Sequence, residues 1–231
     1  MYQLELHCHT KEVSACSTCP AAVQIARYQA AGYQGLVSTN HINRATFRAM
    51  EDRSWAEKVA HFMRGFRLLQ EAAGDDFDVL LGCEINLTPV GWPTYIPNDY
   101  LVYGVTEDWL LDAGDVRDLT LEALSEKTHA AGLLLVHAHP FRHGTVMMNE
   151  ALLDGIEVYN GNIRQNSHNQ LAEYWADLNG KIKTSGSDFH WPDDPCLGGI
   201  ATSERIRDNQ TLLRALRGGQ YTLLRGEAAG R

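Results

Sequence analysis

Two features are missing from this chain of 231 residues: a long apolar run and an excess of positive charge. The longest purely apolar run lies near Leu133–Val136, far short of the roughly 20 residues that a transmembrane helix needs. The first residues contain neither a basic segment nor an apolar core, so we expect no secretory signal. Lysine and arginine number 20 against 29 aspartate and glutamate residues, which gives a net charge of −9. We therefore expect no membrane partner and no binding to bulk nucleic acid, whose phosphates attract basic surfaces.

Cysteine is also scarce, and the few cysteines are scattered. The chain has five of them: Cys8, Cys16, Cys19, Cys83 and Cys196. In a chain of this size, an odd and scattered set favours reduced thiols in the cytoplasm over a disulfide framework, so we expect a cytoplasmic protein. Cys16 and Cys19 form a C-x-x-C pair, but no second pair completes a zinc ribbon. The sequence leaves open whether this pair has a redox or metal role or belongs to an ordinary loop.

No repeat, low-complexity tract or Pro/Gly/Ser linker interrupts the chain, so we expect a single domain over residues 1–231. Short apolar segments predict strands at 4–8, 35–39, 79–85, 101–105, 133–136, 155–159, 182–185 and 221–224. Apolar periodicity, start signals and stop signals predict helices at 20–31, 55–74, 120–131, 171–178 and 209–217. Repeated strand-then-helix order predicts an α/β fold with a parallel sheet, either open or closed into a barrel. Both architectures place functional residues just beyond the carboxyl ends of the strands.

Histidine is abundant, with ten residues, and many of them follow the predicted strands together with carboxylates. The residues at strand ends are His7, His9, His41, Glu84, His137, His139, Asp188 and His190. Three pairs have the spacing i, i+2, which puts both side chains of a pair on one face of a strand. Imidazole and carboxylate together select Zn²⁺, Mn²⁺ or Fe rather than Ca²⁺. Because there are more candidate ligands than one ion uses, we expect two or three divalent metal ions.

The order of these pieces resembles the PHP (polymerase and histidinol phosphatase) family over nearly the whole chain. The motifs that carry the resemblance are His7-Cys8-His9-Thr10, Thr39-Asn40-His41, Glu84 on a strand, His139-Pro140 and Gly186-Ser187-Asp188-Phe189-His190. The resemblance implies a single-domain distorted (β/α)7 barrel with a trinuclear metal centre that hydrolyses phosphoesters. It also implies that His7, His9, Glu84 and Asp188 hold one metal, that Glu84 bridges to a second held by His139, and that His41 and His190 hold a third.

The chain departs from the family pattern at three places. Either Glu12 or Cys16 could complete the third site, where family members often carry Asp or His. Asp99 stands where the family often has a further His, and a carboxylate is a competent ligand there. Asn40 replaces the aspartate of the family's T-D-H motif, which removes a carboxylate near the third metal.

Hydrolysis by a metal-activated hydroxide needs a proton donor for the leaving group and positive charge for the phosphate. His190 or His137 could be the acid, although His137 could instead be a buried hydrogen-bonding residue. Arg142 is the best phosphate anchor, because a guanidinium can grip phosphate with two hydrogen bonds. Arg44, Arg164 and Asn160 also follow strand ends, as substrate-binding residues or as ordinary surface and turn residues. Trp92 and Tyr95, in the long segment 86–99, could stack on a substrate or pack within the loop.

The leading interpretation is a metal-dependent phosphoesterase acting on a small phosphorylated metabolite or nucleotide. One alternative is an amide or ring hydrolase on the same metal centre, and another is a non-catalytic metal-binding module. A polymerase-associated nuclease is less favoured, because the chain is short, acidic and without a basic stripe. Three divalent ions would add about +6 of local charge and make the pocket cationic. Neither the substrate's identity nor the oligomeric state follows from the sequence.

Overall fold

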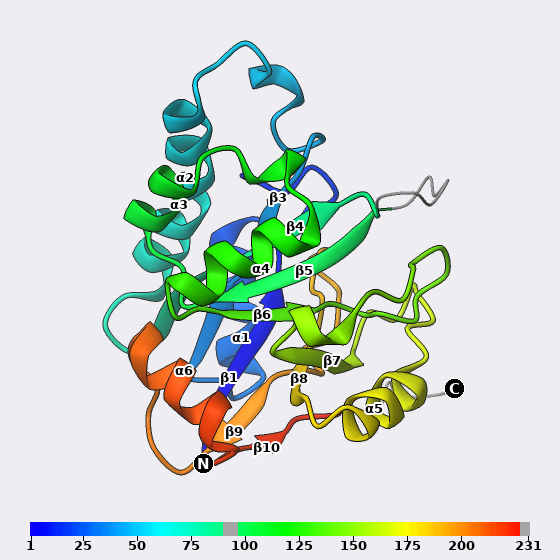
Figure 1. Cartoon of the computed structure of the whole chain (residues 1–231). Coiled ribbons are helices and arrows are strands. Elements are labelled where there is room, and N and C mark those ends of the chain that lie inside the picture. Colours follow the sequence, from blue (N-terminus) through cyan, green and yellow to red (C-terminus); the bar gives the residue numbers. More distant parts are fainter. Residues whose placement is uncertain (90–96, 227–231) are drawn as a thin grey trace.

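A curled sheet runs through the middle of the molecule and helices pack against its outside (Figure 1). The computed structural model describes residues 1–89 and 97–226, and within them ten strands belong to this sheet. The strands are β1 (Tyr2–Cys8), β2 (Gly35–Ser38), β3 (His41–Ile42), β4 (Asp78–Leu87), β5 (Asn98–Tyr103), β6 (Leu134–His137), β7 (Gly155–Asn160), β8 (Ile182–Gly186), β9 (Ile200–Thr202) and β10 (Thr222–Leu223). The helices are α1 (Ala21–Ala30), α2 (Trp55–Ala73), α3 (Glu107–Ala113), α4 (Leu121–Ala130), α5 (Asn169–Leu178) and α6 (Asn209–Gly218).

Seven of the strands nearly close a barrel. Hydrogen bonds connect the sheet in the order β10-β9-β1-β2-β4-β5-β6-β7-β8, and β3 pairs with β4. Just beyond the end of β8, Phe189 forms a parallel bridge to Cys8 at the end of β1, which brings the first and last barrel strands side by side. The barrel strands are therefore β1, β2 and β4 to β8, while β9 and β10 extend the sheet beyond β1. The expected α/β barrel is confirmed.

The expectation of a wholly parallel sheet is wrong at β5. This strand runs antiparallel to both of its neighbours, β4 and β6, and β9 runs antiparallel to β1. The reason is that β4 continues to Leu87 and β5 begins at Asn98. This connection is shorter than the dozen or more residues that a crossover between parallel strands needs, so the two strands pair in opposite directions. The reversed direction places the start of β5 beside the carboxyl end of β4, with Asp99 opposite Asn86. Trp92 and Tyr95 lie outside the described residues.

The helices follow their sequence signals closely. Helix α2 begins after Ser54, which forms a capping box with Glu57, and it ends at Gly74. Its apolar stripe is buried, with Val59 and Phe62 packed in the same core cluster as β4 and β5 residues. Helix α3, which the sequence analysis did not predict, is capped by Thr106. Among the described residues, none of the helices has both the length and the apolar character that crossing a bilayer demands.

Candidate metal centre

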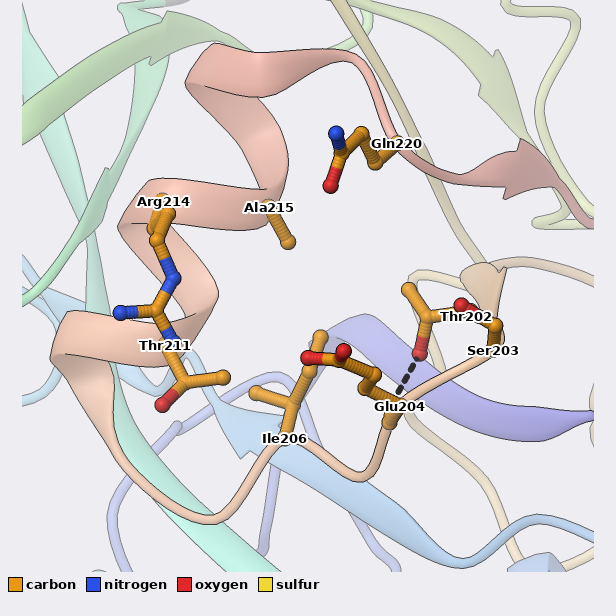
Figure 2. Close-up of a pocket in the computed structure, with 8 residues that line it drawn as sticks. All are labelled: Thr202, Ser203, Glu204, Ile206, Thr211, Arg214, Ala215 and Gln220. Carbon is orange, nitrogen blue, oxygen red and sulfur yellow. Dashed lines mark hydrogen bonds between the residues drawn. The ribbon is translucent and has the colours of Figure 1, made fainter.

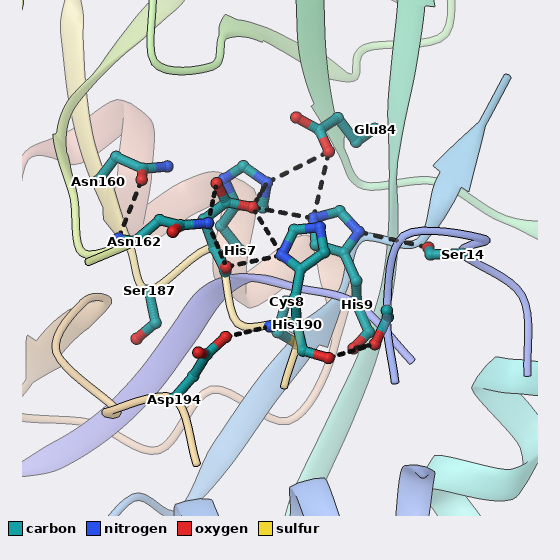
Figure 3. A network of polar contacts seen from close by, with 12 residues as sticks. His7, Cys8, His9, Ser14, Glu84, Asn160, Asn162, Ser187, His190 and Asp194 are labelled. Atoms are coloured by element: carbon teal, nitrogen blue, oxygen red, sulfur yellow. Dashed lines mark hydrogen bonds and ion pairs between the residues drawn. The ribbon is translucent and has the colours of Figure 1, made fainter. Parts of the chain in front are cut away.

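The buried carboxylate of Glu84, on β4, contacts a cluster of histidines, two of which, His7 and His9, are seen beside it in Figure 3. Its Oε2 atom lies 3.3 Å from Nε2 of His7, 3.2 Å from Nε2 of His9 and 3.1 Å from Nδ1 of His41. Its other oxygen, Oε1, lies 3.3 Å from Nε2 of His139. These residues come from β1, β3, β4 and the segment after β6, so the strand ends meet as the barrel rule predicts.

A second carboxylate, Asp188, follows β8 and faces the same histidines. Its Oδ1 atom lies 3.4 Å from Nε2 of His7, 3.3 Å from Nε2 of His9 and 3.3 Å from Nδ1 of His190. The backbone φ angle of Asp188 is +50°, a left-handed conformation that non-glycine residues rarely adopt. His139, which follows β6, also has a positive φ angle, of +30°. Backbone strain at two residues of one cluster is typical of a functional site, where the strained conformation orients the side chains toward one another.

The donor atoms of this cluster fit divalent metal ions. The ring atoms His7 Nε2, His9 Nε2 and His41 Nδ1, and both oxygens of Glu84, are buried and make no hydrogen bond. Metal ligands lie about 2.0–2.2 Å from an ion, so neighbouring ligand atoms around one ion are about 3–3.5 Å apart. The separations of 3.1–3.4 Å between the other donor atoms around Glu84 and Asp188 match this spacing. A set of imidazoles and carboxylates suits Zn²⁺, Mn²⁺ or Fe.

The cluster divides into four overlapping groups of potential ligands. These are His7, His9 and Asp188; His7, Glu84 and His139; His41, Glu84 and Asp99; and His9, His41 and His190. The structure therefore brings together eight of the nine residues named as metal ligands from the sequence. Asp99 joins them because β5 runs in the reverse direction, and its Oδ2 atom lies 3.6 Å from Nε2 of His139.

The local electrostatics keep most of the donors in the form that binds metal. Burial lowers the pKa of His9 well below its usual range and lowers the pKa of His41 to about 4, so both imidazoles are neutral at neutral pH. Burial favours protonation of Glu84, but His7 and His41 outweigh it and hold the pKa of Glu84 well below its usual range. Burial and the nearby Glu84 raise the pKa of Asp99 well above its usual range. Negative charge is therefore concentrated on Glu84 and Asp188 rather than shared equally.

Glu12, the ninth residue, does not lie in the cluster. Its carboxylate accepts a hydrogen bond from the backbone N–H of Ala21 at 3.3 Å, at the start of α1. An acidic group there interacts favourably with the positive end of the helix, which explains its position without a metal. Cys16, the alternative from the sequence, lines a pocket next to the cluster but joins none of its ligand groups.

Asn40, which replaces the family's aspartate, organises the loop that follows β1. Its Oδ1 atom accepts hydrogen bonds from the backbone N–H of Thr10 at 2.7 Å and from the hydroxyl of Ser14 at 2.9 Å. Ser14 in turn accepts a hydrogen bond from the backbone N–H of His41 at 3.0 Å, and its oxygen lies 3.4 Å from Nδ1 of His9. Asn40 therefore contributes to the placement of both histidines.

Apart from His190, the five residues predicted for acid catalysis or substrate binding have unequal surroundings. Arg142 lies against Asp188, with Nη2 2.7 Å from Oδ2, and also donates to Asn160 at 3.0 Å. His137 stacks on Tyr100 with ring centroids 5.0 Å apart and joins none of the ligand groups. Its pKa is lowered to about 3, mainly by burial, so it is a neutral ring inside the barrel.

Arg164 and Arg44 differ in what holds them. Arg164 forms a bidentate ion pair with Asp194, and its guanidinium lies over the ring of Trp191. Both contacts fix the position of the loop that follows His190. Arg44 pairs with Asp118 at 2.5 Å, but both side chains are about two-thirds exposed or more. Such an exposed pair contributes little stability and leaves the guanidinium available to another anion.

A pocket of about 510 Å³ opens beside the cluster. It is lined by Cys16, His41, Asn43, Arg44, Ala45, Asn86, Thr88, Pro97, Asp99 and Arg117. His41 and Asp99 belong to both the pocket and the ligand groups, so a molecule in the pocket would contact bound ions. A smaller cavity of about 70 Å³ lies between β9 and α6, where the lining residues include Thr202 and Arg214 (Figure 2). None of the predicted site residues lines that second cavity.

Sequence reasoning missed two buried carboxylates, Glu5 on β1 and Glu157 on β7. Glu5 accepts hydrogen bonds from the backbone N–H groups of His7 and Ser187, both at 2.8 Å, and from the hydroxyl of Tyr28 at 2.9 Å. Glu157 contacts the ring of His7, with Nδ1 2.8 Å from Oε1. Each lies inside a short apolar strand. An acidic residue within such a strand was the sequence feature that could have indicated a buried carboxylate.

No protein-family model and no curated protein sequence matches this chain. Among solved structures, a two-domain protein from Bacteroides vulgatus that contains a predicted PHP-like metal-dependent phosphoesterase is similar, with a TM-score of 0.67 and 16% identity. That match covers 96% of this chain but only 64% of the other, so this chain spans less than two thirds of it. An amidohydrolase from Chromobacterium violaceum has a TM-score of 0.53 and 17% identity, over 98% of this chain and 99% of that one. Endonuclease Q, in complex with a 27-mer duplex substrate with an abasic lesion at its active site, has a TM-score of 0.59 and 14% identity, over 94% and 56%.

These similarities show a fold shared with PHP-like metal-dependent phosphoesterases, which confirms the resemblance seen in the motifs at the level of the fold. They also correct one expectation. The exclusion of bulk nucleic acid as a partner is wrong as an inference from net charge, because endonuclease Q has this barrel and acts on a duplex. The physical reason is that net charge averages over the whole surface, whereas binding depends on the local field at the site.

Proposed function

We propose that this chain, whose fold is that of PHP-like phosphoesterases, is a metal-dependent hydrolase that cleaves a phosphoester bond. The observation that carries the proposal is the position of Glu84, whose two oxygens lie within 3.3 Å of ring nitrogens from four histidines. A carboxylate in this position can bridge neighbouring ions. Two or three ions of Zn²⁺, Mn²⁺ or Fe fit the donor set.

The ligands divide among the proposed ions as follows. His7, His9 and Asp188 would hold the first ion together with Glu84, and Glu84, His139 and Asp99 would hold a second. His41 and His190, which lie in one ligand group with His9, would hold a third. When bound, such ions act as Lewis acids on a phosphoryl oxygen and lower the pKa of water.

The surrounding side chains orient these ligands and the substrate. The ring of His190 donates from Nδ1 to the backbone oxygen of Asp188 at 2.8 Å, which leaves its Nε2 atom as the ligand atom. His190 therefore serves as a ligand in this proposal rather than as the general acid, and His137 is a structural ring. Arg142 acts mainly through Asp188, and Asn160 holds Arg142 in place.

The substrate that fits best is a small phosphorylated metabolite or nucleotide. The 510 Å³ pocket lies within the range of about 300–1,000 Å³ that small-molecule sites have. Its wall includes Arg44, whose weak exposed pairing with Asp118 leaves it able to contact an anionic part of the substrate. Arg117, in the same wall, is already held by Asp115 and Glu51.

A phosphate-release screen of the Mn²⁺-loaded protein tests the proposal. The panel contains an aryl phosphate, several sugar phosphates and nucleotides, and diesters, with Asp188→Ala as the inactive control. We expect release from at least one phosphoester that the control does not catalyse. A metal-loaded preparation that is inert across all phosphoesters contradicts the proposal.

An amide or ring hydrolase is the second candidate, and the observation that favours it is the barrel shared with an amidohydrolase over nearly the full length of both chains. The same Mn²⁺-loaded protein is tested on a panel of cyclic and linear amides. Turnover of an amide with no turnover of any phosphoester favours this second candidate.

A cytoplasmic location is proposed as well, on the odd number and scatter of the five cysteines.

A further inference from the structure

We infer that Glu157 is a positioning residue that fixes the ring of His7 and the backbone at His139, so that both histidines face the proposed ions. The inference rests on the proposed function only in taking those two histidines as metal ligands. Glu157 belongs to none of the ligand groups and touches the site only through its neighbours. Its side chain is completely buried on β7.

The two oxygens of Glu157 contact different residues. Oε1 accepts a hydrogen bond from Nδ1 of His7 at 2.8 Å. Oε2 accepts one from the backbone N–H of His139 at 2.9 Å and one from the side-chain amide of Asn160 at 3.0 Å. One carboxylate therefore connects β1, the segment after β6 and the end of β7.

The contact with His7 decides which ring nitrogen carries the proton. An ionised carboxylate only accepts hydrogen bonds, so Nδ1 of His7 must carry the hydrogen. In a neutral imidazole the other nitrogen is then bare, and Nε2 is the atom that faces Glu84 and Asp188 at 3.3 and 3.4 Å. Carboxylate–histidine–metal arrangements of this kind fix both the tautomer and the ring orientation.

The contact with His139 maintains an unfavourable backbone conformation. His139 has a φ of +30°, and its N–H points to Oε2 of Glu157. A buried N–H without a partner costs free energy, so the carboxylate favours this conformation over alternatives in which the N–H is turned away. The same conformation brings Nε2 of His139 within 3.3 Å of Glu84.

Glu157→Gln separates a positioning role from a packing role. Glutamine has the same shape as glutamate, but its amide nitrogen donates hydrogen bonds where a carboxylate oxygen accepts them. If its oxygen takes the place of Oε2, where two donors converge, its amide faces Nδ1 of His7. Nδ1 must then accept, the proton moves to Nε2, and the metal-facing nitrogen is blocked. The matched control is Glu5→Gln, since Glu5 is equally buried and undergoes the same substitution but contacts His7 only at its backbone N–H and contacts no histidine ring.

For the NMR measurement, full-length protein with ¹⁵N-labelled histidine is loaded with Zn²⁺. Metal-free protein is unsuitable, because Glu157, Glu84 and Asp188 outweigh burial and raise the pKa of His7, which protonates both ring nitrogens. Long-range ¹H–¹⁵N correlation NMR reads which ring nitrogen of each histidine carries a proton. A His7→Gln variant assigns the His7 signals. In the wild type and in Glu5→Gln we expect the proton of His7 on Nδ1, and in Glu157→Gln on Nε2. Titration of the same proteins with Zn²⁺ should give an affinity about 10- to 100-fold weaker for Glu157→Gln than for the wild type.

The two readouts must change together to support the inference. A His7 tautomer that is the same in Glu157→Gln and wild type overturns it, and so does an unchanged Zn²⁺ affinity. If Glu157→Gln does not fold, Glu157→Asp decides, because it keeps the charge but shortens the reach to both partners. Weakened Zn²⁺ binding in a folded Glu157→Asp supports the inference, and wild-type binding overturns it. Neither readout uses phosphate release, so a failure of the proposed phosphoesterase activity is seen separately.

Discussion

Arg142 and Asp188 form a buried ion pair in which one oxygen of the carboxylate is taken by the guanidinium and the other is left for the metal centre. Nη2 of Arg142 lies 2.7 Å from Oδ2, while Oδ1 faces His7 and His9 at 3.4 and 3.3 Å. Asn162 adds a hydrogen bond to Oδ2 at 3.2 Å. Burial favours the protonated acid, but His7 and Arg142 outweigh it and hold the pKa of Asp188 well below its usual range. Arg142 thus keeps Asp188 ionised and oriented.

This pairing predicts that Arg142→Ala weakens metal binding as well as turnover. Asp188 would lose its main cationic partner, and changes to groups that orient metal ligands typically cost about 10- to 100-fold in affinity or activity. Arg142→Lys should fall between, because lysine keeps the charge but not the planar fork. The measurements are a Zn²⁺ titration and kcat/KM for a phosphoester. Wild-type metal affinity combined with a raised KM would instead assign Arg142 to direct phosphate binding.

Removing a residue that would bind an ion directly should lower turnover more than Arg142→Ala does. Asp188→Ala and His9→Ala each take a donor from the group that holds the first ion. Metal ions contribute several kcal/mol of transition-state stabilisation, which corresponds to a loss on the order of 10³-fold in kcat. Phosphate release and metal content measured on the same preparations check this, with His61→Ala, on α2, as the control. Retained turnover in either ligand variant would place the reacting ion elsewhere.

Chelation distinguishes an enzyme from a non-catalytic metal-binding module. Metal present at 100 times its Kd stabilises the native state by about 2.7 kcal/mol, so its removal should lower Tm by about 5–10 °C in a domain of this size. The barrel has large core clusters apart from the metal ligands, so we expect the chelated protein to stay folded at 25 °C. Thermal unfolding by circular dichroism and a turnover assay measure both effects. Unfolding on chelation, in a protein that is inactive even when loaded, would favour the module.

Most of the metal centre could be predicted from the sequence because strand geometry is local. The i, i+2 spacing of His7 and His9 puts both rings on one face of β1 whatever the rest of the chain does. The carboxyl ends of parallel strands then bring Glu84 and Asp188 to the same mouth of the barrel. These arguments need no knowledge of which strands are neighbours.

The rest depended on long-range placement, which local pattern does not contain. Asp99 was named as a ligand from the family pattern, but the antiparallel β5 that brings it to the cluster was not predicted, because strand order alone indicated a parallel sheet. Glu12 was one of two candidates, with Cys16, for the place where family members often carry Asp or His, but the turn after β1 directs it to the start of α1. Glu157 was missed because a single acidic residue in a strand has the same pattern whether it faces solvent or the barrel interior.

The pocket wall predicts different outcomes for the two arginines that the sequence could not tell apart. Arg44 lines the pocket and is weakly held, so Arg44→Ala should raise KM several-fold for an anionic substrate with little change in kcat or stability. Arg164 is held by Asp194, which also accepts hydrogen bonds from the backbone N–H groups of His190 and Trp191. Arg164→Ala should therefore leave KM unchanged and lower the free energy of unfolding by about 1.5–3 kcal/mol, the range for hydrogen bonds to charged groups. Steady-state kinetics and urea unfolding on both variants separate the two roles. An equal rise in KM for both would mean that the loop held by Arg164, and not the 510 Å³ pocket alone, contacts the substrate.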